Sequence, residues 1–260
     1  MKAFIIVLQE SEHSRSVGSD SIKEANKFGV YPEVFNAING YQSAKVFEKH
    51  GITRFLTRDL IEQPGHQGCF LSHFELWMKC VELDEPIIIL EHDGVFIREL
   101  PDNILDMFDG VLKLDPLLPY NGFSTYNYKV EKSLMLNNPI EVWDQPARGK
   151  WYGVGEFIWG AYGYIIKPKA AASLIDFAQR IGACPTDVHI GRNLVDIKTT
   201  RVPVVRLHEF YTDHTIRRES TTAKLEKFVA GENQLAGKQR FTKEQYEELV
   251  SDYSKEKEIK

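Results

Sequence analysis

The sequence has 260 residues, of which 43% are hydrophobic, and a formal net charge of −5. This length and composition suit one large domain with its own core, and they exclude collagen-like and disordered chains. The acidic balance argues against a protein that coats nucleic acid by charge. Three cysteines without a C-x-x-C pair predict neither a zinc site nor a disulfide framework.

No stretch of the sequence approaches the roughly 20 apolar residues that a membrane span requires. Met1 and Lys2 lead directly into an apolar run with no small-residue cleavage site after it, so no signal peptide is predicted. We therefore expect a cytoplasmic protein whose contact with an inner membrane would be peripheral. The sequence does not predict an oligomeric state.

The N-terminal third alternates between strand and helix patterns. Residues 3–8 form a continuous apolar run typical of a strand buried on both faces. Asp20 and Ser21 are candidate caps for a helix that ends at Gly29, and residues 30–37 return to a strand pattern. This strand–helix–strand order predicts an α/β fold with a mostly parallel twisted sheet flanked by helices.

The middle of the chain contains the clearest periodicity. Apolar residues recur at helical spacing over residues 68–82, and a buried strand is predicted directly after this helix, at residues 86–90. Further along, we expect a short helix at 101–108, strands at 111–114, 157–166 and 200–207, and a helix at 168–181. The stretch 116–155 is rich in loop-forming and aromatic residues, and 220–260 reads as a mixed-charge helical segment.

The strongest chemical signal is the acidic end of the predicted strand 86–90, where Glu91, His92 and Asp93 follow an apolar run. Ligands of α/β sheets bind outside the carboxyl ends of strands. In an extended chain, Glu91 and Asp93 would share a face, and paired carboxylates suit Mg²⁺ or Mn²⁺. The alternative is a polar strand end with hydrogen-bonded carboxylates.

A second signal is the glycine-containing start of the helix at 68–82. Gly68 would allow close backbone approach, while Ser72 and His73 could add contacts to an anion at the helix N-terminus. The alternative is an ordinary helix start in which His73 is satisfied inside the protein.

Taken together, GHQGCFLSHFELWMKCVELDEPIIILEHDGVF closely resembles the signature of glycosyltransferase family 25, the bacterial lipopolysaccharide and lipooligosaccharide galactosyltransferases. Three more segments are similar to that family: residues 34–40, residues 158–166 and the Cys-Pro-Thr-Asp segment at 184–187. The resemblance extends over most of residues 1–216.

This resemblance implies a single catalytic domain of the GT-A type. Residues 1–115 would bind the nucleotide sugar, and residues 116–219 would bind the acceptor and carry out catalysis. The implied reaction is inverting, metal-dependent transfer of galactose from UDP-galactose to a sugar hydroxyl of the core oligosaccharide on lipid A, with a β-1,4 linkage. The alternatives are glucosyl or N-acetylhexosaminyl transfer to the same acceptor class, or a non-catalytic sugar-binding domain.

The resemblance also assigns roles to residues. Asp93 and Glu91 match the outer carboxylates of an acidic triplet that holds Mn²⁺ or Mg²⁺, with His208 as the third ligand and His189 or His214 as alternatives. His92 replaces the usual middle acid, and only one arginine stands where relatives often show several. The expected donor contacts are Leu8, Arg15, Ala37, Asn39, Gly68, Ser72, His73, Glu91, His92 and Arg217. Arg217 is included because guanidinium groups suit phosphate, and a solvated basic pair with Arg218 is the alternative.

Inverting transfer needs a base that accepts the proton of the attacking hydroxyl. Asp187 is the leading candidate, although it could instead cap a helix over 188–194, and Glu156 is the second candidate. Aromatic residues that could stack on acceptor sugars gather in and after the loop-rich stretch: Tyr120, Phe123, Tyr126, Tyr128, Trp143, Trp151, Tyr152 and Trp159. For most of these, ordinary core packing is the alternative.

Overall fold

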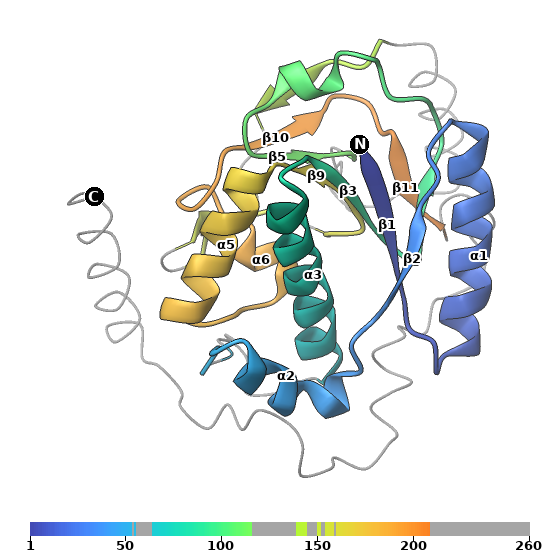
Figure 1. Cartoon of the computed structure of the whole chain (residues 1–260). Helices are drawn as coiled ribbons and strands as arrows, with labels where there is room; N and C mark the ends of the chain where they lie inside the picture. Colours follow the sequence, from blue (N-terminus) through green and yellow to red (C-terminus); the bar gives the residue numbers. More distant parts are fainter. Residues whose placement is uncertain are drawn as a thin grey trace.

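A computed structural model describes residues 1–53, 55, 64–115, 139–144, 150–151, 154–158 and 160–208. Helices cover both faces of a central sheet, with α3 and α5 packed together on one face and α1 on the other (Figure 1). The predicted α/β fold, a mostly parallel sheet flanked by helices, is confirmed.

The central sheet has seven strands in the order β2-β1-β3-β9-β5-β10-β6. The pairs β2–β1, β1–β3 and β5–β10 are parallel, whereas β9 runs antiparallel to both of its neighbours and β6 runs antiparallel to β10. Five strands therefore point in one direction. Their bounds are β1 Lys2–Val7, β2 Glu33–Asn36, β3 Ile87–Glu91, β5 Val111–Lys113, β6 Val142–Asp144, β9 Gly163–Ile166 and β10 Ile197–Thr200.

Side-chain alternation along the central strands feeds two cores. In β1, Phe4 and Ile6 join the core beneath α3 and α5, while Ile5 and Val7 join the core beneath α1. β3 repeats this pattern, because Ile87 and Ile89 enter the first core and Ile88 and Leu90 the second. Apolar residues on both faces explain why these strands are continuous hydrophobic runs in the sequence.

Two of the predicted helices agree closely with the structure. α3 (Pro64–Leu83) contains the helix predicted at 68–82, and α5 (Pro168–Arg180) matches the one predicted at 168–181 and begins with proline at its first turn. α1 spans Glu12–Lys27, so the start predicted near Asp20 is wrong. Ser11 is the actual cap, since its side chain accepts a hydrogen bond from the Ser14 N–H (3.2 Å).

The shorter helices lie around this framework. They are η1 (Gly40–Gln42), α2 (Ser43–Lys49), η2 (Ile104–Met107) and α6 (Thr186–His189). η2 is a 3₁₀ turn where a short helix was expected at 101–108. α6 begins before Asp187, with Pro185 at the cap position, so the predicted helix 188–194 capped by Asp187 is also wrong.

Two small sheets complete the described fold. β4 (Gly94–Phe96) pairs antiparallel with β11 (Val205–Leu207), and β7 (Lys150–Trp151) pairs with β8 (Gly155–Glu156). The strands predicted at 157–166 and 200–207 are therefore each broken. β9 begins only at Gly163, and residues 200–207 are divided between β10 and β11. The predicted segment 220–260 lies outside the described residues.

Candidate functional site

The carboxyl ends of three neighbouring parallel strands meet at one edge of the sheet. β1 continues into Leu8, β2 continues into Ala37 and β3 ends at Glu91. The Ala37 N–H donates to the Val7 carbonyl (2.9 Å), which holds the first two strand ends together. This edge is where α/β sheets bind ligands, and the donor contacts expected of Leu8 and Ala37 stay predictions.

Two turns at this edge are tied down locally. The Leu8 N–H donates to Ser14 Oγ (3.0 Å), and the Arg15 guanidinium donates to the Gln9 carbonyl, so Arg15 lies beside the end of β1. Asn39 Oδ1 accepts from the Tyr41 N–H (3.0 Å) and so caps η1. Arg15 and Asn39 therefore both belong to this edge of the sheet.

The acidic segment forms a turn. β3 ends at Glu91 and β4 begins at Gly94, so the expectation of an extended chain through Asp93 is wrong. A side chain at Gly94 would collide with the Tyr162 carbonyl oxygen, which explains the glycine after the acidic residues. His92 faces α1, because Ser21 Oγ donates to its carbonyl (2.8 Å) and its ring lies 6.3 Å from that of His13.

Asp93 and His208 lie opposite each other at the end of the β4–β11 pair. The His208 N–H donates to the Asp93 carbonyl (2.7 Å), one step beyond the Leu207–Gly94 register pair. Asp93 is buried, with 5% of its surface exposed. The structure therefore brings together two of the three residues expected to bind metal, although 114 other residues separate them in the sequence.

A buried ion pair joins this small sheet to the central one. Arg206 of β11 contacts Asp115, two residues after the end of β5, with Nη1 3.3 Å from Oδ2. The Tyr162 hydroxyl donates to the same Asp115 oxygen (2.7 Å). Because both partners are buried, this pair holds β11, which ends just before His208, at a fixed place beside the central sheet.

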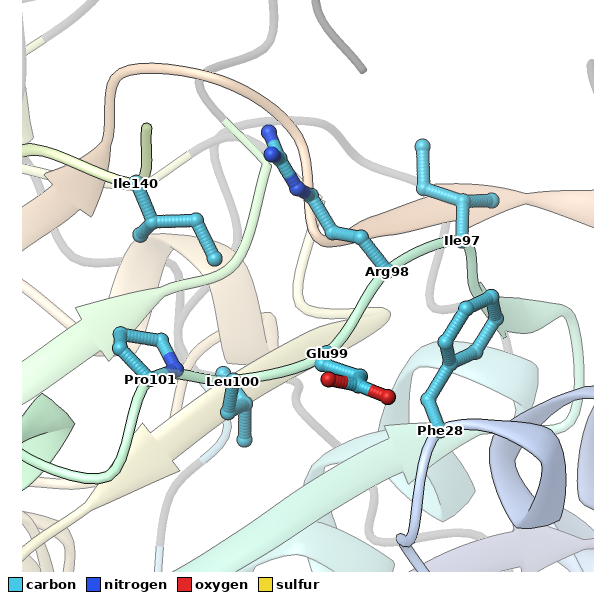
Figure 2. A pocket seen from close by; sticks show the side chains of 7 residues that line it. All are labelled: Phe28, Ile97, Arg98, Glu99, Leu100, Pro101 and Ile140. Atoms are coloured by element: carbon cyan, nitrogen blue, oxygen red, sulfur yellow. The ribbon is translucent and has the colours of Figure 1, made fainter. Parts of the chain in front are cut away.

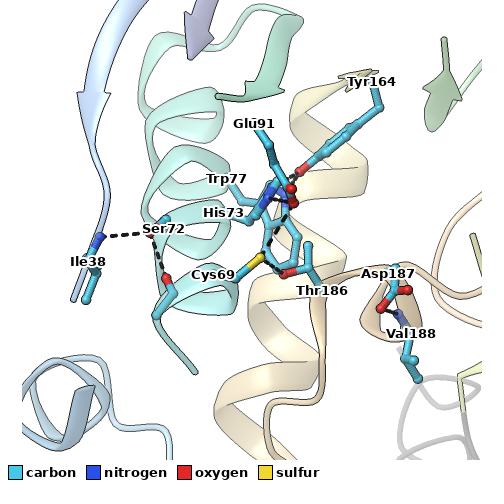
Figure 3. A network of polar contacts seen from close by, with 11 residues as sticks. Ile38, Cys69, Ser72, His73, Trp77, Glu91, Tyr164, Thr186, Asp187 and Val188 are labelled. Atoms are coloured by element: carbon cyan, nitrogen blue, oxygen red, sulfur yellow. Dashed lines mark hydrogen bonds and ion pairs between the residues drawn. The ribbon is translucent and has the colours of Figure 1, made fainter. Parts of the chain in front are cut away.

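Glu91 ends a chain of hydrogen bonds that begins in the core (Figure 3). The Trp77 Nε1–H donates to the Tyr164 hydroxyl (2.9 Å), which lies 2.8 Å from His73 Nδ1. His73 Nε2 lies 3.2 Å from Glu91 Oε1, and the Cys69 thiol donates to the same oxygen (3.6 Å). α3 supplies Cys69, His73 and Trp77 because these residues lie four apart and share one helix face.

The sulfur, nitrogen and oxygen atoms of Cys69, His73 and Glu91 all lie within 4.8 Å of one another, close enough to hold a metal ion. Hydrogen bonding accounts for this cluster better. A metal on His73 Nε2 would leave the proton on Nδ1, directed at Tyr164, whose oxygen already accepts from Trp77. The Tyr164 hydroxyl proton would then have no acceptor among the described contacts.

Asp187 lies next to this network. Cys69 Sγ is 3.4 Å from the hydroxyl of Thr186, the residue before Asp187, so α6 begins beside Glu91. Asp187 Oδ1 accepts from the Val188 N–H (3.0 Å). The structure therefore brings the two sequence-predicted carboxylates Glu91 and Asp187 into one neighbourhood.

The surroundings of Glu91 and Asp187 shift their pKa values in opposite directions. Burial would raise the pKa of Glu91, but the hydrogen bond from His73 and the neighbouring imidazoles outweigh it and lower that pKa. Burial, and then the charge of Glu91, raise the pKa of Asp187 above its usual value, against hydrogen bonds from the Gly160 and Val188 N–H groups. Opposed shifts in one site are typical of carboxylates with different chemical roles.

The other base candidate is held differently. Glu156 in β8 pairs with Arg192, with Oε2 3.2 Å from Nε, and its carbonyl accepts from the Arg192 N–H (2.7 Å). In the part of the chain that the structure describes, the polar contacts around Glu91 lead to Asp187 and not to Glu156.

His189, an alternative metal ligand, is a core residue. It is fully buried, with its ring stacked 5.5 Å from that of Trp77. Its Nε2 donates to the Leu174 carbonyl (3.0 Å), and Nδ1 lies 3.3 Å from Cys184 Sγ. Because both ring nitrogens are engaged inside the protein, His189 does not fit a ligand role.

The glycine and serine of α3 join the helix to the loop after β2. A side chain at Gly68 would collide with the Ile38 carbonyl oxygen and the backbone of Gly40. Ser72 Oγ donates to the Gly68 carbonyl (2.7 Å) and accepts from the Ile38 N–H (2.8 Å). Ser72 and His73 are fully buried, so neither has exposed surface for the direct donor contact expected of it.

A pocket of about 490 Å³ lies away from this site (Figure 2). It adjoins a second pocket that is lined by the first residues of β1 and β2, and the two share Phe28, Glu99 and Leu100. Both pockets therefore lie toward the amino ends of the strands, whereas the candidate site lies at their carboxyl ends. The length of β1 puts about 20 Å between these two edges of the sheet. The lining residues of the first pocket are Phe28, Ile97, Arg98, Glu99, Leu100, Pro101 and Ile140.

Several expected contacts lie outside the described residues, namely Arg217, His214 and the aromatic residues Tyr120, Phe123, Tyr126, Tyr128, Tyr152 and Trp159. Trp143 is 43% exposed on β6. The sequence analysis missed the parts played by Tyr164, Trp77 and Thr186. The Ala-Tyr-Gly-Tyr segment around Tyr164 and the four-residue spacing in α3 were the available signals.

Comparison with known proteins identifies the family. The family described as glycosyltransferase family 25 (LPS biosynthesis protein) matches residues 1–190, a span that contains Glu91, Asp93 and Asp187. The chain belongs to glycosyltransferase family 25. The resemblance seen in the sequence is thereby confirmed.

Two individual proteins resemble this family 25 member in part. The chain is 31% identical over 83 residues to the lipooligosaccharide biosynthesis protein lic2B of Haemophilus influenzae, a match that covers 32% of the chain and 30% of lic2B. The apo crystal structure of mouse xyloside xylosyltransferase 1 aligns with a TM-score of 0.31 and 8% identity, over 72% of this chain and 78% of that one. No helix in the described part of the chain is both long and apolar enough to cross a membrane.

Proposed function

We propose that this family 25 member transfers galactose from UDP-galactose, with inversion, to a sugar hydroxyl of a lipooligosaccharide or lipopolysaccharide core, forming a β-1,4 linkage. The observation that carries the proposal is the pair of carboxylates Glu91 and Asp187, which adjoin at the carboxyl edge of the sheet and whose pKa values shift in opposite directions. The galactosyl donor and the linkage rest on the family resemblance alone. The similarity to lic2B, a lipooligosaccharide biosynthesis protein, supports the acceptor class.

In this proposal the two carboxylates divide the work. Glu91 stays ionised and binds the donor, through its ribose or through a metal ion. Asp187 accepts the proton of the attacking hydroxyl, because a raised pKa brings a carboxylate closer to the value at which it is an effective base near neutral pH. The contact from Cys69 to Thr186 supports this division, since it fixes the start of α6 beside Glu91.

The metal assignment follows the family resemblance at the acidic turn. Asp93, Glu91 and His208 would hold the ion, with two carboxylates, which suit Mg²⁺ or Mn²⁺, and one imidazole. The backbone hydrogen bond between His208 and Asp93, which places the two residues side by side at the end of β4–β11, supports this assignment. When bound, the ion would offset the negative charge that grows on the departing nucleoside diphosphate.

Binding of the donor and metal can be tested by thermal shift. UDP with Mn²⁺ is expected to raise the melting temperature of the wild type more than either does alone. Asp93→Asn should abolish this synergy, because it removes a metal-binding charge with little change in size. Asp109→Asn, at an exposed carboxylate, is the matched control and should retain it.

A panel of nucleotide sugars in the same assay tests the donor. UDP-galactose should stabilise the protein more than UDP-glucose or a UDP-N-acetylhexosamine. A larger effect of either competitor would reassign the donor, and no metal-dependent effect of UDP in the wild type would contradict the transferase proposal.

A further inference from the structure

A column of polar side chains crosses the core beneath Glu91. Trp77, Tyr164 and His73 are all fully buried, whereas the Glu91 side chain at the end of the column is 28% exposed. The column thus leads from the interior to the edge of the sheet (Figure 3). Apolar residues of similar size could fill the same space without the cost of burying three polar groups.

The direction of each hydrogen bond in the column follows from its chemistry. The indole N–H of Trp77 can only donate, so the Tyr164 oxygen accepts it. Burial raises the pKa of Tyr164 well above its usual value, so this hydroxyl keeps its proton. The acceptor within reach of that proton is His73 Nδ1, at 2.8 Å.

This direction determines which nitrogen of the His73 imidazole donates to Glu91. With Nδ1 accepting from Tyr164, the ring proton that makes the hydrogen bond to Glu91 Oε1 lies on Nε2. A doubly protonated His73 would also bond Glu91, but it would leave the buried Tyr164 proton with no acceptor among the described contacts. Such an orphaned buried donor costs about 1–3 kcal/mol.

Glu91 is therefore held through one of its oxygens. Both His73 and Cys69 donate to Oε1, and the described hydrogen bonds to this carboxylate all end on that atom. Oε2 is the oxygen left for a ligand. Protein groups that orient a ligand-binding carboxylate in this way raise its affinity by fixing its geometry in advance.

We propose that Trp77, Tyr164 and His73 are positioning residues that orient the Glu91 carboxylate so that Oε2 receives the donor. This inference rests on the proposed role of Glu91 in donor binding. None of the three residues touches the donor; each acts through the next, and His73 acts directly on Glu91.

The tautomer of His73 can be measured in the protein without ligands. Two-dimensional ¹⁵N–¹H NMR distinguishes an imidazole protonated on Nε2 from one protonated on Nδ1 or on both nitrogens, and the His73→Gln spectrum identifies which signal belongs to His73. The proposal predicts the Nε2–H tautomer in the wild type. Either of the other two forms would overturn it.

The effect on the donor is tested with a matched pair of variants at His73. Glutamine places an amide N–H near the position of Nε2, whereas leucine offers no donor. By calorimetry, His73→Leu should weaken the affinity for UDP–Mn²⁺ about 10–100-fold, the range typical of losing a group that hydrogen-bonds to a metal ligand. His73→Gln should recover part of this loss, and Tyr164→Phe should fall between the wild type and His73→Leu.

A core variant separates positioning from general destabilisation. Phe177→Leu alters a fully buried residue of α5 in the same core and should lower the melting temperature while leaving the affinity for UDP–Mn²⁺ unchanged. If His73→Leu binds UDP–Mn²⁺ as tightly as the wild type does, the positioning role is wrong and the proposed function stands. If the wild type itself does not bind UDP–Mn²⁺, the proposed function fails first.

Discussion

At the scale of single residues, Glu91 and Asp187 are both carboxylic acids, and their different surroundings give them different properties. His73 donates a hydrogen bond to Glu91 and favours its charged form. Asp187 is partly buried and lies near the charge of Glu91, and both effects favour its neutral form, which His66 partly offsets. The first carboxylate is suited to binding and the second to exchanging a proton.

The pH dependence of transfer should report on Asp187. As a base, Asp187 must be deprotonated, so kcat/KM should rise with pH through the raised pKa of Asp187. This rise is the acidic limb of the pH profile. His66→Gln removes a positive neighbour and should move this acidic limb to higher pH. His13→Gln, at the other side of the sheet beside His92, should leave the limb in place. A limb that does not move with His66, or moves to lower pH, would contradict the assignment.

The sequence could predict Glu91, Asp93 and Asp187 because each lies in a short motif. It could not predict how Tyr164 and Thr186 serve the site. Tyr164 is 91 residues from His73 and Thr186 is 117 residues from Cys69, so only the packing of β9 and α6 against α3 reveals those contacts.

At the scale of elements, α3 organises the site. One face of this helix carries the residues that reach Glu91, while Gly68 and Ser72 join it to the loop after β2. Its periodicity made it predictable. The start of α1 was missed because Ser11, a serine within a polar stretch, is a weaker signal than the Asp20–Ser21 pair. β9 begins only at Gly163, where a side chain would collide with Val205.

Two helical glycines form a matched pair for testing this contact. Alanine favours a helix interior over glycine by about 1 kcal/mol, so substitution in open space would stabilise the protein. At Gly68 the new methyl group would strike backbone atoms, and overpacking costs about 1–3 kcal/mol. Thermal unfolding should therefore show a clearly lower melting temperature for Gly68→Ala.

In Gly18→Ala the new methyl group would meet one side-chain methyl of the buried Val7 at 2.9 Å and no backbone atom. This variant should lose less stability than Gly68→Ala and melt at a higher temperature. Equal melting temperatures for the two variants would show that the contact between α3 and the 38–40 loop is looser than the structure indicates.

His189 gives the fold a defined acid sensitivity. Burial lowers the pKa of His189 to about 4. Between its unfolded pKa of about 6.5 and its folded pKa, His189 binds a proton in the unfolded chain but not in the folded protein. The contribution of His189 to the free energy of unfolding is therefore complete above about pH 6.5 and falls as the pH drops toward 4. At about 1.36 kcal/mol per pH unit, His189 accounts for about 2 kcal/mol of loss between pH 6.5 and 5.

Denaturant unfolding at pH 7 and pH 5 measures this loss. His189→Gln should be less stable than the wild type at pH 7, because it disturbs the core, but should lose less further stability at pH 5. Parallel losses in the two proteins would show that His189 is protonated in the folded state.

At the scale of the whole molecule, a three-layer α/β fold brings its chemistry to one edge of the sheet. The apolar strands and the helix periodicity predicted this architecture. The order of the strands was not predictable in the same way, because β9 and β10 reach the sheet from late in the sequence and β9 enters antiparallel between β3 and β5. The expected acceptor contacts fall largely outside the described residues.

Sugar transfer by the whole protein tests the central claim most directly. Wild-type protein, Asp187→Asn and Glu156→Gln are each incubated with UDP-galactose, Mn²⁺ and a lipooligosaccharide core acceptor. The mass of the acceptor is then measured by mass spectrometry. We predict the addition of one hexose by the wild type and by Glu156→Gln, and none by Asp187→Asn, which should still bind UDP–Mn²⁺. Normal transfer by Asp187→Asn, or no transfer by a wild type that binds UDP–Mn²⁺, would contradict the account.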